Sequence, residues 1–220
     1  MRAFFILCGL LASAAIAQGH FIFVYVDPQA KDIRVVFGHG ATPDPDVPVA
    51  RAEGTKLFAK TGDTATELTV KKAEGNYYVA EMPKTAPEVI YGETKAGVTQ
   101  RGEMPPMLST YYSKTVPTLT DKAVAAKLAL EFTAAKHEQG VRFQLLQDGK
   151  PVPTAEITLT FNADEDDIKV KTDKDGYTQV FQEKGTYALA AQVQVDKKGE
   201  LDGKKYEKVR TVASIIVRLE

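Results

Sequence analysis

The chain has 220 residues, of which 44% are hydrophobic and 26% are charged. This is the composition of a globular protein of one or two domains, and it excludes intrinsic disorder. The formal net charge is −1, so there is no basic field and nucleic acid is excluded as a partner. Three histidines leave few candidates for acid–base catalysis or for a metal site built from many imidazoles.

The first 17 residues predict an export signal. Arg2 supplies a positive charge, residues 3–14 form an uncharged apolar run, and residues 15–17 give a cleavage site of the A-x-A type. The run is shorter than the roughly 20 residues that a membrane-spanning helix needs. We therefore expect residues 1–17 to be cleaved, and the mature protein to be periplasmic or secreted, without a transmembrane segment. The only cysteine, Cys8, leaves with the signal.

The residues after the signal predict short β-strands. Aromatic and β-branched residues favour strands over 20–26 and 32–38, and closely spaced prolines mark 39–50 as a loop or edge segment. Alternating polar and apolar residues predict the next strands, over 55–60, 66–73, 76–82, 88–94, 97–103 and 108–115.

The segment from 121 to 137 is ambiguous, because its alanines favour a helix while residues 127–134 alternate as a strand does. We predict a strand from about Lys127, after a loose or short helical lead-in. The pattern then becomes regular, with a polar hairpin tip over 197–208 and strands over 141–147, 155–162, 168–173, 177–182, 185–195 and 209–219.

Short strands separated by Gly- and Asp-containing turns indicate an all-β protein. We predict two antiparallel, Ig-like β-sandwich units after the signal. The expected boundary lies near Pro117, which gives an N-terminal domain over 18–118 and a C-terminal domain over 119–220.

Two resemblances agree with this architecture. Residues 141–191 carry the DGKPVP hairpin, the TDKDG turn and the GTYALAA strand, and they resemble carboxypeptidase-regulatory-like, CnaB-type sandwich modules. The start HFIFVYVDP, the segment VVFGHGATPDPDVPV and the segment VIYGETKAGVTQRGE resemble an exported bacterial family of unknown function, grouped with periplasmic nickel/cobalt-uptake (NikM-like) proteins. The second resemblance implies an extracytoplasmic protein linked to transition-metal handling.

His20 is the first candidate metal ligand, because export creates a new N-terminus beside it. Cleavage after Ala17 leaves Gln18 as the first residue, and its backbone amine, two amide nitrogens and His20 can then enclose Cu(II) or Ni(II) in a square plane. Cleavage after Gly19 makes His20 the first residue instead. Its amine and ring then pair with a second histidine, either His39 or His137.

His39 is the preferred partner because of its surroundings, since it lies between two glycines and precedes Asp44 and Asp46, which offer oxygen ligands. His137 lies in a polar turn and is expected to be exposed. Two acidic loops are weaker candidates. The turn at 173–176 lacks the glutamate that completes a calcium loop, and the acidic run at 162–167 is expected to be solvated.

Two functions are consistent with these residues. The first is a non-enzymatic extracytoplasmic binding protein that holds Cu(II), Ni(II) or Co(II) through His20 and His39 and acts with an envelope protein or transporter. The alternative is a structural or adhesive envelope module that binds protein or polysaccharide, without a metal.

Overall fold

The structure is a computed structural model that describes residues 20–100, 102–162 and 167–220. Strands form nearly all of its regular structure, which confirms the all-β prediction. The described residues include one short 3-10 helix, Val49–Ala52, and no helix long and apolar enough to cross a membrane. The predicted signal segment falls outside the described residues.

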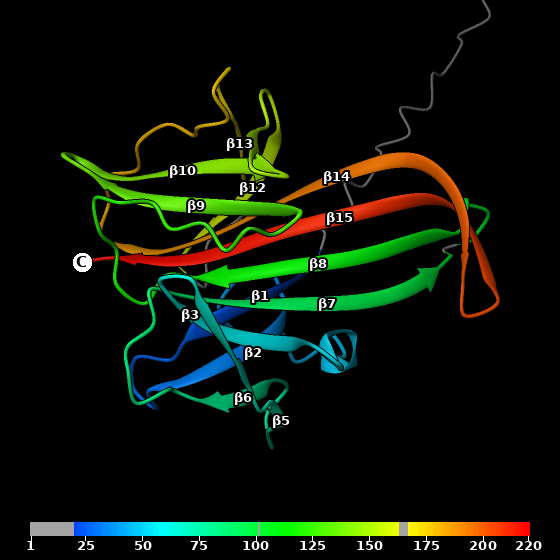
Figure 1. The fold of residues 1–220 in the computed structure, drawn as a ribbon, viewed down its shortest axis with the longest axis horizontal. Helices are drawn as coiled ribbons and strands as arrows, with labels where there is room; N and C mark the ends of the chain where they lie inside the picture. Colours follow the sequence, from blue (N-terminus) through cyan, green and yellow to red (C-terminus); the bar gives the residue numbers. More distant parts are fainter. Residues whose placement is uncertain (1–19, 101, 163–166) are drawn as a thin grey trace, which may run out of the picture.

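Three sheets stack as three layers (Figure 1). The middle layer has eight strands in the order β13 (Ile168–Lys171), β12 (Glu156–Phe161), β14 (Gly185–Leu201), β15 (Lys204–Leu219), β8 (Met107–Thr115), β7 (Val89–Thr99), β3 (Lys56–Thr61) and β4 (Thr64–Leu68). One outer layer has the order β1 (Phe21–Val26), β2 (Asp32–Gly38), β6 (Tyr78–Glu81) and β5 (Lys71–Lys72). The other has the order β11 (Lys150–Pro151), β10 (Gly140–Gln147) and β9 (Leu130–His137).

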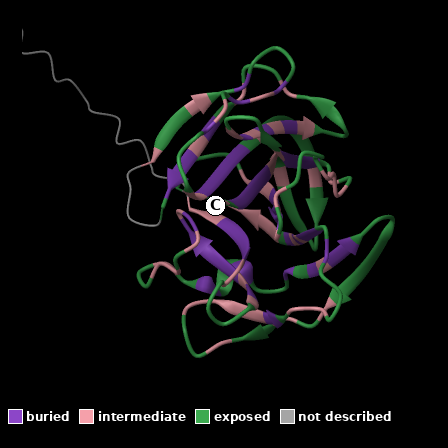
Figure 2. Cartoon of the chain, turned by 90° about the vertical axis from the view of Figure 1, so that its left-hand side faces the viewer, coloured by how far each residue is buried: buried purple, intermediate pink, exposed green. Residues whose placement is uncertain are grey.

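Alternation along β15 explains why the middle sheet has two buried faces. Ala213, Ile215 and Val217 pack with side chains of β9 and β10, whereas Val212 and Ile216 pack with side chains of β1 and β2. Successive residues of a strand point to opposite faces, so each outer sheet covers one set of these side chains. Figure 2 shows the buried strands at the centre and the exposed residues at the rims and loops.

Two serines fix β1 against the middle layer. The backbone oxygen of Ile22 accepts hydrogen bonds from Ser113 Oγ of β8 at 2.7 Å and from Ser214 Oγ of β15 at 2.5 Å. Both serines are buried, so these bonds satisfy groups that would otherwise lack partners in the core. These bonds therefore position the start of β1, which directly follows His20.

The middle sheet departs from the predicted antiparallel pattern at one pairing. β8 and β15 run parallel, with Tyr111 opposite Val212 and Ser113 opposite Ser214. One hydrogen-bonded sheet thus passes from strands before Pro117 to strands after it. The division into domains at 118 and 119 stays a prediction.

Several strand predictions need local corrections. The expected strands over 88–94 and 97–103 form one strand, β7, and the expected strand over 66–73 is divided between β4 and β5. The hairpin tip expected over 197–208 is only residues 202–203, because β14 and β15 extend to either side of them.

β9 begins at Leu130 rather than near Lys127, and of the two lead-ins expected before it, loose or short helical, the structure has the loose one. The expected strand over 177–182 is reduced to isolated bridges at Tyr177 and Phe181. The turn at 173–176 is confirmed, since Asp173 Oδ1 accepts hydrogen bonds from the backbone N–H of Asp175 and of Tyr177 within this connection, each at 2.9 Å.

Candidate metal centre

The β1–β2 hairpin brings two of the predicted ligands together. Phe21 pairs with Gly38 at its open end, so His20 and His39 follow at the same end of the ladder. Their rings lie 4.4 Å apart between centroids and tilt by 57°. The pairing register explains this proximity. In a regular antiparallel ladder, one step back from Phe21 on the first strand faces one step forward from Gly38 on the second, and these steps lead to His20 and His39.

Asp44 reaches the same place through the proline-containing loop after His39. Its Oδ1 accepts the backbone N–H of Asp46 at 2.9 Å, which holds the loop in a tight turn. The side-chain amide of Asn76 donates to the backbone oxygens of Asp44 and Val47, the latter at 2.7 Å, and so clamps the loop from a distant part of the chain. These bonds place the Asp44 carboxylate opposite His20.

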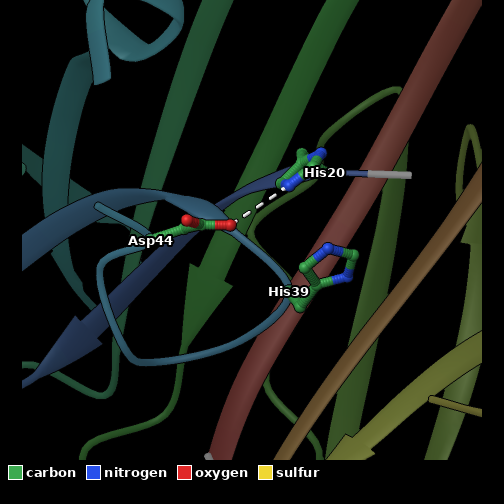
Figure 3. A group of neighbouring side chains, drawn as sticks. All are labelled: His20, His39 and Asp44. Atoms are coloured by element: carbon green, nitrogen blue, oxygen red, sulfur yellow. Dashed lines mark hydrogen bonds and ion pairs between the residues drawn. The ribbon is translucent and has the colours of Figure 1, made fainter. Parts of the chain in front are cut away.

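The three side chains form one compact group (Figure 3). His20 Nε2 lies 3.2 Å from Asp44 Oδ2, and the ligand atoms of His20, His39 and Asp44 all lie within 4.8 Å of one another. The side chains of His20, His39 and Asp44 are 31%, 30% and 26% exposed, so the group is half-buried and open to solvent on one side.

This spacing suits a first-row transition metal. Ligand atoms about 2.1 Å from a metal lie about 3.0–3.4 Å apart at bond angles of 90–109°, and about 4.2 Å apart across it. The His20–Asp44 separation of 3.2 Å falls in the first interval, and all the ligand atoms lie within 4.8 Å of one another. Two imidazoles and one carboxylate are donors that Cu(II), Ni(II), Co(II) and Zn(II) accept.

The structure brings some of the predicted site residues together and leaves others apart. It brings His20, His39 and Asp44 together, whereas Asp46 is exposed and His137, at the end of β9, is not part of the group. Gln18, whose backbone amine was a predicted ligand, lies outside the described residues. Sequence reasoning missed Asn76, because only the folded loop shows what its amide binds.

The fold and the site define an all-β protein with a candidate metal centre at the open end of its first hairpin. Comparison with family models gives a match to the Domain of unknown function (DUF4198) over residues 17–195. The match spans most of the chain and the whole candidate centre, and the chain belongs to this family. Among curated proteins, no sequence matches it.

Proposed function

We propose that this chain is a non-enzymatic extracytoplasmic protein that binds a divalent transition-metal ion through His20, His39 and Asp44. The observation that carries the proposal is the convergence of these three side chains, with all ligand atoms within 4.8 Å of one another. All three were candidate ligands from the sequence alone. The resemblance to nickel/cobalt-uptake (NikM-like) proteins supports the same class of ligand.

The donor set favours Cu(II) among the divalent ions. Affinities of nitrogen and oxygen sites rise from Co(II) through Ni(II) to Cu(II). The chain's only cysteine lies in the predicted signal, so the proposed mature protein offers no thiolate, the donor that favours Cu(I). The backbone amine at the mature start, Gln18 or His20 according to the cleavage point, would supply a further nitrogen.

Replacing His20 with alanine in natively processed protein is expected to lower Cu(II) affinity by at least about 100-fold, because an imidazole ligand is lost. Asp44→Ala is expected to lower it as well, through loss of the oxygen ligand. The affinity is measured by competition with a coloured Cu(II) chelator. The protein must be exported and carry no N-terminal tag, since a tag removes the free amine.

Asp46→Ala is the matched control. Asp46 lies in the same loop as Asp44, and its carboxylate is exposed and outside the group. Its replacement is expected to leave Cu(II) affinity within about twofold of the wild type. Unchanged affinity in His20→Ala would overturn the proposed function, and equal losses in Asp44→Ala and Asp46→Ala would remove Asp44 from the ligand set.

A further inference from the structure

A second carboxylate, which is not part of the metal group, contacts the ring of His39. Asp167 directly precedes β13, and its Oδ2 lies 3.3 Å from Nδ1 of His39. Its side chain is only 12% exposed, although it belongs to the acidic run over 162–167, which was expected to be solvated. A carboxylate this buried needs hydrogen-bonding partners.

Thr160 of β12 holds this carboxylate in place. Its Oγ1 lies 2.8 Å from Asp167 Oδ1 and 2.7 Å from the backbone oxygen of His39, and it can donate to either acceptor. The hydroxyl has one proton, so it donates to one of these two acceptors at a time, and it lies between the carboxylate and the backbone of the histidine that the carboxylate contacts. Both Thr160 and Asp167 come from the C-terminal half, whereas His39 comes from the N-terminal half.

This contact decides which nitrogen of His39 is free. A neutral imidazole has one N–H donor and one acceptor, and the hydrogen bond made by one nitrogen sets the role of the other. With a carboxylate at Nδ1, the proton stays on Nδ1 and the lone pair is on Nε2. In Figure 3, one ring nitrogen of His39 faces His20 and the other points away.

We propose that Asp167 is a positioning residue of the metal centre, which holds His39 in the Nδ1–H tautomer so that Nε2 is the metal donor. The proposal rests on the proposed function and deepens it, since it makes the C-terminal half a necessary part of the site. A carboxylate on the far nitrogen of a metal-binding histidine fixes the ring and makes the ligand more basic, and its loss typically costs about 10–100-fold in metal affinity.

The test uses full-length, natively processed protein with Asp167→Ala, and Asp167→Asn as a second variant that keeps the shape of the side chain. Nitrogen NMR of metal-free protein labelled with ¹⁵N-histidine reads the tautomer directly. The chain has three histidines, so His39→Ala identifies the His39 signals. Cu(II) affinity is measured on the same samples by chelator competition.

We expect the wild type to show His39 with the proton on Nδ1 and Asp167→Ala to shift it toward the Nε2–H form. Cu(II) affinity is expected to fall about 10–100-fold in Asp167→Ala and by less in Asp167→Asn, whose amide oxygen can still accept the Nδ1 proton. Asp175→Ala, which removes an exposed aspartate from another turn, is expected to change neither the tautomer nor the affinity.

The outcomes separate this proposal from the proposed function. A wild type that binds no Cu(II) overturns the proposed function, and this proposal with it. A wild type that binds Cu(II) while Asp167→Ala keeps both its tautomer and its affinity overturns the role of Asp167 alone. Lost affinity with an unchanged tautomer also overturns it, because the loss then has a different cause.

Discussion

Replacing His39 with alanine is expected to lower Cu(II) affinity by at least about 100-fold, whereas His137→Ala leaves it within about twofold. His39 belongs to the group of ligand atoms beside His20, and His137 does not. Removing a residue that only hydrogen-bonds a metal ligand typically lowers metal affinity about 10–100-fold, so removing a direct ligand is expected to lower it at least as much. The measurement is chelator competition at fixed pH on natively processed protein.

His137→Ala is a matched control, because it removes the same side chain from an exposed position at the end of β9. Comparing these two variants also distinguishes the two arrangements that the sequence left open: a site within residues 18–20, and a site in which His20 pairs with a second histidine. Unchanged affinity in His39→Ala would place all the nitrogen ligands within residues 18–20 and contradict the site proposed here. An equal loss in His137→Ala would show that the effect of His39 is not specific to the site.

Replacing Glu131 with alanine is expected to lower the free energy of unfolding by about 3–5 kcal/mol, the cost of breaking a buried ion pair. Glu131 Oε2 lies 2.8 Å from Lys114 Nζ, and their side chains are 2% and 1% exposed. The same carboxylate accepts the backbone N–H groups of residues 126, 127 and 128, at 2.7, 2.9 and 3.3 Å. Its loss leaves three amides without this acceptor, and it leaves the Lys114 ammonium without its counter-ion, with the backbone oxygen of Val124 still bound.

Urea denaturation measures this loss, and Glu131→Gln provides a second variant that keeps the volume of the side chain. Glu156→Ala is the control, since Glu156 is also a strand glutamate paired with a lysine, but its pair with Lys169 is exposed and 3.7 Å long. Its loss is expected to cost about 0.5 kcal/mol or less. Equal costs in Glu131→Ala and Glu156→Ala would contradict the importance of the buried pair.

The buried pair also predicts a pH dependence. Burial holds the pKa of Lys114 below its usual value, and Glu131 opposes this shift. The unfolded chain therefore binds the proton more strongly between the folded and unfolded pKa values of Lys114, and stability increases as pH rises through that interval. Glu131→Ala removes the interaction that opposes this shift, so the rise of stability with pH is expected to begin at a lower pH in this variant than in the wild type, as urea denaturation at a series of pH values measures.

The sequence was sufficient to predict the two strands beside which the histidines lie. Residues 20–26 and 32–38 were expected as strands, and pairing them as a hairpin puts His20 and His39 at one end. The sequence did not distinguish Asp44 from Asp46, because the path of their loop depends on the amide of Asn76. Asp167 was hidden in an acidic run, and its burial follows from the packing of β12 and β13 near the first hairpin.

The ambiguity of the segment from 121 to 137 also has a physical cause, which lies in residues 124–128. Alanines favour a helix there, but three consecutive amides bind the carboxylate of Glu131 instead, and the backbone of Lys127 takes a positive φ of 65°. The ammonium groups of Lys60 and Lys114 hold the backbone oxygens of Ala125 and Val124, at 2.8 and 2.7 Å. Helix propensity is a local property, so it gives no indication of hydrogen bonds between this backbone and charged side chains of the strands around it.

Native mass spectrometry of the wild-type chain, exported from a bacterial host and exposed to Cu(II) or Ni(II), tests the central claim most directly. It reads the first residue of the mature chain and the bound metal in one spectrum. The proposed site predicts one metal ion per chain, held by protein that begins at Gln18 or His20 with a free amine. A fully processed chain with a free amine that stays metal-free at excess Cu(II) and Ni(II) would contradict the metal centre.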